Sequence, residues 1–127
     1  LTIERAADLA ALVQCLARWL VLEQPFALGE DDYLPYAYNR FQACRWGLEA
    51  QLVDPQTHEP RTLREDFAQL WPQLAPHAQA LGAEAALARL HREVLRGDTD
   101  AGWLRRTRSE HDDISVLVAR QTERWRA

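Results

Sequence analysis

Two arginines and an asparagine in the first half of the chain have side chains that could bind a charged ligand. Arg40 and Arg45 stand close to Asn39 in the stretch GEDDYLPYAYNRFQACRWGLEA. A guanidinium group binds carboxylate or phosphate with fixed two-point geometry, so these arginines are candidate anion ligands. Residues five apart on a straight helix point about 140° apart, so the two groups would not form one shared clamp. The spacing alone leaves an anion site and structural salt bridges as alternatives, and it favours salt bridges.

Asp31 and Asp32 open the same stretch and offer a second kind of chemistry. Adjacent carboxylates can ligate a hard cation, but acidic side chains before a helix also stabilise the positive end of its dipole. We favour the helix interpretation. The four histidines do not stand at zinc-ligand spacing from a cysteine or an acid, and the five glycines form no phosphate-binding loop. We therefore expect no metal ligands in this segment.

The composition is that of one ordinary globular domain. The chain has 127 residues, of which 47% are hydrophobic and 27% charged, and its net charge of −4 gives no reason to expect nucleic acid or an anionic membrane. No run reaches the roughly 18 apolar residues that a membrane helix needs. Cys15 and Cys44 both lie within apolar patterns, which predicts small buried side chains in a reducing cytoplasm rather than a disulfide framework.

The elements that must position these side chains are mainly helical, because apolar spacing and capping signals predict five to six helices and one small β-hairpin. The first half is expected to contain a helix from Ile3 to Glu23 capped by Thr2, a helix from Leu34 to Trp46 ended by Gly47, and two short strands around the turn at 54–60. Two longer helices should follow, one from Leu63 after the capping box Thr62–Glu65 and one from Ala83 to Arg96. The chain should end with a short helix capped by Asp98 or Thr99 and a last helix opened by residues 109–112. The first helix is apolar on more than one side, which predicts a partner on each side.

The second helix is expected to have two different faces. Its core face would be apolar and its second face would form hydrogen bonds. The expected core residues are Ala37, Phe41, Cys44 and Leu48, and the expected hydrogen-bonding residues are Asn39, Gln42 and Trp46. In the last helix, the residues expected to be buried are Ile114, Leu117, Val118 and Trp125.

The run YNRFQACRWGLEAQLVDPQT resembles the signature near the C-terminus of YbdK-type bacterial carboxylate–amine ligases, which belong to the type 2 glutamate–cysteine ligase family. The segments LTIERAADLAALVQCLARWL, DPQTHEPRTLREDF, LAPHAQALGA, LHREVLRG and TERW follow the same pattern in the same order. The resemblance covers essentially the whole chain. One departure is Trp46, which stands where the family has Tyr or Phe.

The resemblance implies a fold and a place in a larger protein. Residues 1–127 would be a single C-terminal helical region of a ligase whose α+β fold is like that of glutamine synthetase. The catalytic sheet and its Mg²⁺-binding carboxylates would lie upstream, in an N-terminal portion of the same polypeptide that this chain lacks. The absence of Met, with Leu1 in first position, agrees with a segment of a longer chain.

The resemblance also implies an activity. ATP would phosphorylate the γ-carboxylate of glutamate, and the acyl phosphate would react with the amine of cysteine, weakly, or of a related amino compound. Arg45 and Arg40 match the family motif as candidate catalytic residues and Asn39 as a candidate substrate-binding residue. ATP and Mg²⁺ would be bound mainly by the missing N-terminal portion, so the isolated segment is expected to be inactive. The implied partners are that portion, the small-molecule substrates and a homo-oligomer, and the implied location is the cytoplasm.

A different class of function is compatible with the same residues. The chain could be a stand-alone helical module that binds another protein through its first helix and the aromatic patch near residue 36. The two-sided apolar first helix and the missing Met favour the ligase interpretation.

Overall fold

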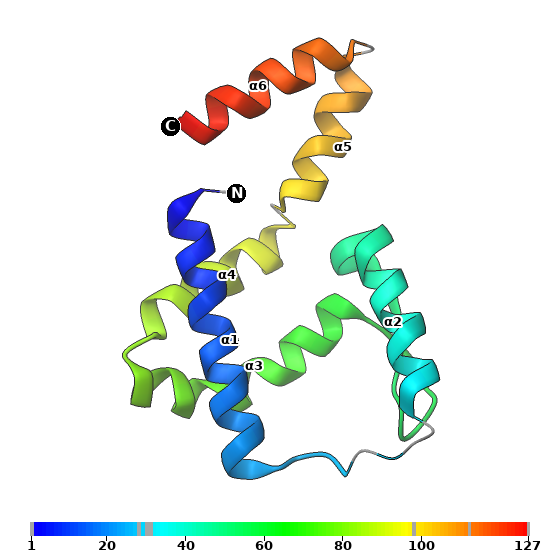
Figure 1. Cartoon of the computed structure of the whole chain (residues 1–127), viewed down its shortest axis with the longest axis vertical. Helices are drawn as coiled ribbons and strands as arrows, with labels where there is room; N and C mark the ends of the chain where they lie inside the picture. Colours follow the sequence, from blue (N-terminus) through cyan, green and yellow to red (C-terminus); the bar gives the residue numbers. More distant parts are fainter. Residues whose placement is uncertain (1, 28, 30–31, 98, 112, 127) are drawn as a thin grey trace.

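A computed structural model describes residues 2–27, 29, 32–97, 99–111 and 113–126. This part of the chain is mainly α, as the sequence predicts, with six α-helices and one two-stranded antiparallel hairpin (Figure 1). The elements are α1 (Ile3–Glu23), α2 (Tyr33–Trp46), the 3₁₀ turn η2 (Gly47–Glu49), β1 (Gln51–Val53), β2 (Pro60–Thr62), α3 (Leu63–Leu81), α4 (Glu84–Arg96), α5 (Asp100–Glu110) and α6 (Ile114–Arg126). No helix within the described ranges is long and apolar enough to cross a membrane.

The predicted capping residues begin and end the helices. The Thr2 hydroxyl accepts a hydrogen bond from the backbone N–H of Arg5 at the start of α1. Thr62 and Glu65 form both hydrogen bonds of the capping box at the start of α3. Gly82 ends α3 with φ of 64°, a left-handed conformation that glycine adopts without steric cost. Asp98, one of two predicted caps of α5, lies outside the described residues, and the other, Thr99, accepts from the N–H of Gly102.

The core lies where α1 packs against α3 and α4 (Figure 1). Cys15 and Trp19 of α1 are buried against Leu74 and Ala78 of α3 and Leu87 of α4. Complete burial of one leucine side chain contributes about 1.5–3 kcal/mol, so these contacts account for much of the stability of this body. The second apolar side of α1 is exposed, because Val13 and Val21 are among the large hydrophobic residues that no described segment covers.

The predicted core face of α2 is wrong for this chain. Phe41 is 58% exposed, and Ala37 and Cys44 are exposed as well. The physical reason is the orientation of the helix, which turns Asn39 rather than Phe41 toward β1. Of the two cysteines predicted to be buried, only Cys15 is buried.

The predicted start of the last helix is also wrong. Ser109 and Glu110 form the end of α5, and His111 then adopts an extended conformation that breaks the helix. Asp113 accepts a hydrogen bond from the N–H of Ser115, so it takes the place expected of Ser109 at the start of α6. Three of the four residues expected to be buried in α6 are exposed, namely Ile114, Val118 and Trp125.

Candidate functional site

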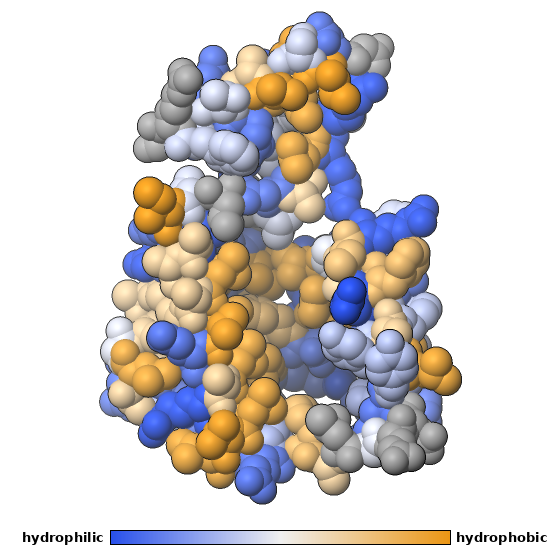
Figure 2. Space-filling view, viewed as in Figure 1, coloured by the Kyte–Doolittle hydropathy of each residue, from blue (hydrophilic) through white to orange (hydrophobic). Residues whose placement is uncertain are grey.

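A groove of about 550 Å³ lies between α2, the hairpin and the segment before α2. The α2 residues that line it include Tyr36, Asn39 and Arg40, which lie within two turns of each other on one side of the helix. Leu52 and Pro55 are part of the opposite wall. Figure 2 shows this face of the molecule hollowed between α1 and α2, with hydrophobic side chains along α1. The groove is mixed in character, with apolar walls and several charged groups.

Asn39 fixes the distance between the two walls of the groove. Its Nδ2 donates to the backbone oxygen of Val53 at 2.8 Å, and its Oδ1 accepts from the backbone N–H of Val53 at 2.7 Å. A side-chain amide thus satisfies both backbone hydrogen-bonding groups of one residue in β1, which leaves α2 and the hairpin in a defined register. The predicted substrate-binding residue is therefore at the groove, where its hydrogen bonds to Val53 are structural.

Arg61 is the basic group of the hairpin wall, and its charge is already compensated. It forms ion pairs of 2.5 Å with Asp54 and 2.9 Å with Asp66. The backbone N–H groups of Thr57 and Gln56 also donate to Asp54, and they, followed by the nearby Arg61, hold the pKa of the Asp54 carboxyl below its ordinary value. This triad carries a net charge of −1 and stiffens the turn of the hairpin.

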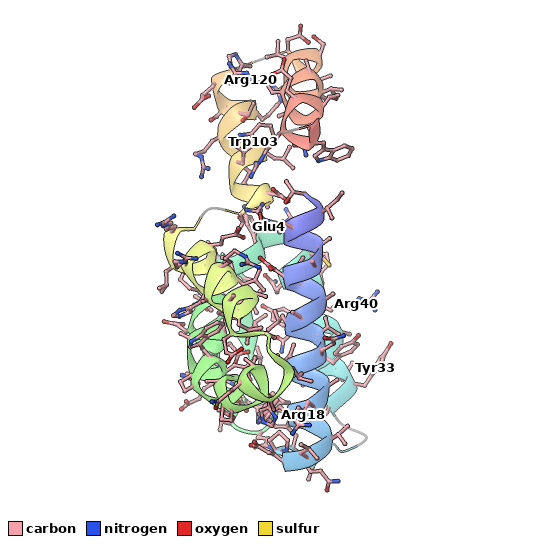
Figure 3. The ribbon with its side chains drawn as sticks, turned by 90° about the vertical axis from the view of Figure 1, so that its left-hand side faces the viewer. Glu4, Arg18, Tyr33, Arg40, Trp103 and Arg120 are labelled. Atoms are coloured by element: carbon pink, nitrogen blue, oxygen red, sulfur yellow. The ribbon has the colours of Figure 1, made fainter. Side chains whose placement is uncertain are left out.

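Arg40 differs from Arg61 because it has no hydrogen-bond or ion-pair partner in the described part of the chain. Its side chain extends outward from α2 at the groove (Figure 3). Arg45 does not line the groove, and its guanidinium lies over the Trp46 ring, 5.2 Å from the ring centroid. The structure thus places the two candidate arginines apart. Among the described residues, neither forms the salt bridge that spacing favoured.

Asp31 and Asp32 are predicted to stabilise the start of α2, and of the two only Asp32 lies among the described residues. Asp32 is the N-cap residue of α2, and its Oδ2 accepts a hydrogen bond from the N–H of Gly29 at 2.7 Å rather than from the helix itself. The residues that the structure describes contain no group of three or more His, Cys, Asp or Glu that could hold a metal ion.

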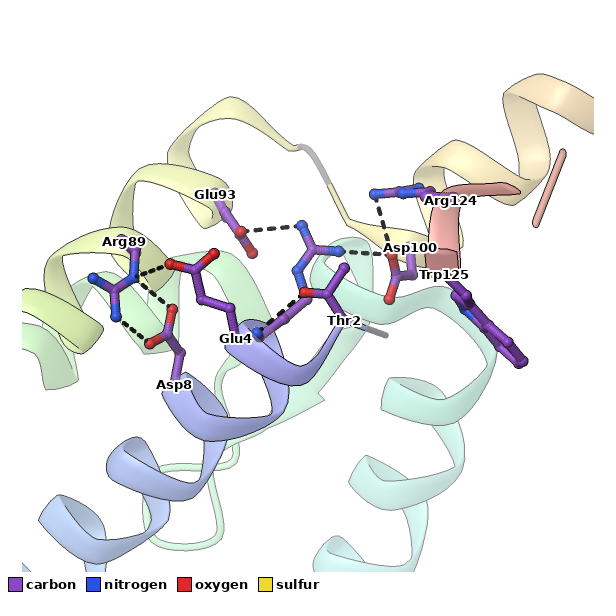
Figure 4. Close-up of a pocket in the computed structure, with 9 residues that line it drawn as sticks. Thr2, Glu4, Asp8, Arg89, Glu93, Asp100, Arg124 and Trp125 are labelled. Carbon is purple, nitrogen blue, oxygen red and sulfur yellow. Dashed lines mark hydrogen bonds and ion pairs between the residues drawn. The ribbon is translucent and has the colours of Figure 1, made fainter. Parts of the chain in front are cut away.

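A second, smaller cavity of about 110 Å³ lies among charged residues where α1, α4, α5 and α6 meet (Figure 4). Arg89 forms a two-point ion pair with the buried carboxylate of Asp8, with distances of 2.6 and 2.9 Å. The hydrogen bonds from Arg89 hold the pKa of Asp8 below its ordinary value. Arg5 joins Glu93 at 3.0 Å and Asp100 at 2.6 Å. These contacts connect helices, so we interpret the cluster as structural.

No motif in the sequence predicts this cluster, and its one local signal is Asp8, a charged residue within an otherwise apolar stretch of the first helix. No motif predicts the contact of His77 either, whose buried Nε2 lies 2.7 Å from a carboxylate oxygen of Glu23. The same carboxylate accepts from the Trp19 indole N–H at 3.1 Å, so it ties the end of α1 to α3. Both arrangements join residues more than 50 positions apart, which spacing along the chain cannot reveal.

Comparison with known proteins identifies a family over nearly the whole chain. The family model described as glutamate-cysteine ligase family 2 matches residues 1–121, a range that includes every residue of the groove. A protein of Leptothrix cholodnii named "Putative glutamate--cysteine ligase 2" is 51% identical over 125 residues. The match covers 98% of this chain and 33% of that relative. The chain thus spans about a third of the length of this curated relative.

Proposed function

This chain belongs to the glutamate–cysteine ligase family 2, and from that premise we propose that it forms the C-terminal helical part of an ATP-dependent carboxylate–amine ligase of the cytoplasm. The proposed reaction joins the γ-carboxylate of glutamate to the amine of cysteine, weakly, or of a related amino compound. ATP transfers its terminal phosphoryl group to the carboxylate and leaves as ADP. The amine nitrogen then forms a bond to the acyl carbon, loses a proton, and phosphate leaves.

The observation that carries this proposal is the position of the motif residues. Asn39 and Arg40 lie at an open groove, and Arg40 has no partner among the residues that the structure describes. An unpaired guanidinium beside a groove is suited to neutralise the charge of a bound anion, which is the main requirement of chemistry on carboxylates and phosphates. Arg45, exposed outside the groove, is proposed to contact a part of the active site that other segments of the polypeptide contribute.

The ATP and Mg²⁺ sites are proposed to lie mainly outside residues 1–127. The described residues present no metal-binding cluster, and those that line the groove include only one arginine that is not already paired with aspartates. A triphosphate with its metal needs several donors and carboxylates together. We therefore assign no step that involves the metal or the nucleotide to a residue of this chain.

The exposed apolar surfaces of α1 and α2 are proposed to contact the N-terminal portion of the same polypeptide. Phe41 and Tyr38 on α2 and Val13 and Val21 on α1 are all at least 46% exposed. The relative from Leptothrix cholodnii is about three times as long as the matched stretch, so it has further chain that could cover such surfaces. A homo-oligomer, or a different protein bound by a helical interaction module, would use the same surfaces.

The test is an assay of the complete gene product that carries residues 1–127. It is incubated with ATP, Mg²⁺, glutamate and one amine at a time, beginning with cysteine. ADP release is measured together with the mass of the amide product. We expect ADP and amide in equal amounts with at least one amine. Release of ADP without amide, or no reaction with any amine, would contradict the ligase proposal and favour the interaction module.

The isolated 127-residue chain provides a second test. We expect it neither to bind Mg²⁺–ATP tightly nor to hydrolyse it, because the proposed nucleotide site is elsewhere. Titration calorimetry measures this directly, and micromolar binding of Mg²⁺–ATP to the isolated chain would show that the assignment of that site is wrong.

A further inference from the structure

We propose that the groove between α2 and the hairpin binds a small zwitterion, with its ammonium group near Asp32, its carboxylate near Arg40 and an apolar portion between them. The inference that such a ligand binds rests on the residues of the groove alone. Its identification as an amine substrate of the ligase rests on the proposed function, in which it would be the related amino compound rather than cysteine, whose two charges lie on one carbon.

The charges of the groove lead to this ligand class. Among the described residues, three aspartates and two arginines line it, and these five give a formal charge of −1 at neutral pH. Arg61 is paired with Asp54 and Asp66. Two charged groups of the lining therefore remain without an ion pair in the described part of the chain, the cation of Arg40 and the anion of Asp32. Asp32 uses Oδ2 to accept from Gly29, and its Oδ1 has no hydrogen bond from a described residue.

The spacing of these groups defines the shape of the ligand. Asp32, Tyr36 and Arg40 are four residues apart in turn, so they lie on one side of α2. Two residues eight positions apart are separated by about 12 Å along a helix axis. Tyr36 stands midway between them along the helix and is 56% exposed. Leu52 and Pro55 face this strip from the opposite wall. The ligand should therefore carry its two charges at opposite ends of an apolar chain.

Other ligand classes fit these groups less well. A free phosphate would meet one unpaired guanidinium, whereas phosphate sites normally supply several donors. A dicarboxylate such as glutamate would bring a second negative charge into a groove whose formal charge is already −1. An amine without a carboxylate would leave Arg40 uncompensated. A ligand with both charges satisfies both ends.

The experiment measures binding of 6-aminohexanoate to the complete gene product by titration calorimetry, without ATP or glutamate. Two analogues each lack one charge: hexanoate lacks the ammonium group, and hexylamine lacks the carboxylate. We expect 6-aminohexanoate to bind with millimolar affinity and each analogue to bind about fivefold more weakly, the factor typical of one partly exposed ion pair.

Two variants assign the charges to their partners. Arg40→Gln should weaken 6-aminohexanoate and hexanoate about fivefold and leave hexylamine unchanged. Asp32→Asn keeps an acceptor for the Gly29 N–H and should weaken 6-aminohexanoate and hexylamine, leaving hexanoate unchanged. Arg120→Gln removes an exposed positive charge from α6 and serves as the matched control (Figure 3). Arg40→Gln and Arg120→Gln should melt at the wild-type temperature, and Asp32→Asn should melt only slightly lower, because it removes about 0.3–1 kcal/mol of interaction with the positive end of the α2 dipole.

Three specific results would contradict the zwitterion site. Absence of 6-aminohexanoate binding, equal affinity for all three compounds, or equal effects of Arg40→Gln and Arg120→Gln would overturn the proposal. Because binding is measured without turnover, its failure is distinguishable from failure of the ligase proposal. An active ligase that does not bind 6-aminohexanoate contradicts only the groove assignment, and an inactive protein that binds it contradicts only the ligase assignment.

Discussion

The body formed by α1, α3 and α4 and the unit formed by α2 and the hairpin are held together by different forces. The body buries Cys15, Trp19, Leu74 and Leu87 in one apolar cluster. None of the residues of α2 is buried, and its closest connection to β1 is the pair of hydrogen bonds made by Asn39. Burial of apolar surface is the larger stabilising term. The comparison indicates that stability resides in the body, whereas the open unit is available for binding a ligand.

The largest expected effect is in the body. Leu74 is fully buried, so Leu74→Ala should lower the free energy of unfolding by about 2–5 kcal/mol through lost contacts and a new cavity. Urea denaturation followed by circular dichroism measures the change. Leu95→Ala on α4, where the side chain is 63% exposed, is the matched control and should cost less than about 0.5 kcal/mol. Similar losses in both variants would contradict the location of the core.

The next largest effect concerns the ion pair of the body. Asp8→Asn should cost about 1.5–3 kcal/mol at neutral pH, because Arg89 loses its charged hydrogen-bond partner. The pKa of Asp8 is lower in the folded chain than its ordinary value of 3.8. The stability that the pair contributes is therefore complete above that value and is lost as the pH falls through the folded pKa.

The matching measurement is the free energy of unfolding of both proteins between pH 7 and pH 2. The difference between wild type and Asp8→Asn should be constant down to about pH 4 and should shrink below it. A difference that grows as the pH falls would contradict the sign of this linkage.

A smaller loss of unfolding free energy is expected where α2 meets β1. Asn39→Ala removes both hydrogen bonds to Val53 and should cost about 1–2 kcal/mol. Amide hydrogen exchange should show faster exchange at Val53 and unchanged protection at Leu74. Asn39→Asp keeps an acceptor for the Val53 N–H but cannot donate to its carbonyl oxygen, so it should slow that exchange relative to alanine. Loss of protection throughout the body would show that the two regions are not separate.

A still smaller effect on stability is expected at Arg45. Its side chain is exposed and its contact with Trp46 is worth about 0.5–1 kcal/mol at most. In the complete gene product, Arg45→Ala should therefore lower kcat/KM more than it lowers the melting temperature. Steady-state kinetics and thermal melting are compared on the same preparation. A large loss of stability with unchanged specific activity would return Arg45 to a structural role.

The sequence predicts local features of the fold well and distant contacts poorly. The Thr62–Glu65 capping box and the glycine at position 82 act within one helical turn, so their residue types determine the conformation. The direction in which a helix turns its faces depends on which neighbour it packs against. The apolar positions of α2 predicted that Phe41 would be buried, whereas the Asn39 amide turns that face outward.

The candidate site shows the same contrast between local features and distant contacts. The motif indicated Asn39, Arg40 and Arg45 as a set, but only the first two line the groove. The pairing of Arg61 with Asp54 and Asp66 leaves Arg40 as the groove's unpaired cation among the described residues. The absence of an ion pair at Arg40 depends on the hairpin folding back on α3, and no sequence pattern near residue 40 predicts that fold.

The most direct test of the separation between a stable body and a ligand-binding unit is kcat/KM of Arg40→Gln for the amine substrate in the complete gene product. Its melting temperature is measured alongside, and Arg120→Gln is the control. We expect kcat/KM to fall by about tenfold or more while the melting temperature stays at the wild-type value. Unchanged kcat/KM, or a fall in kcat/KM together with a lower melting temperature, would contradict this separation.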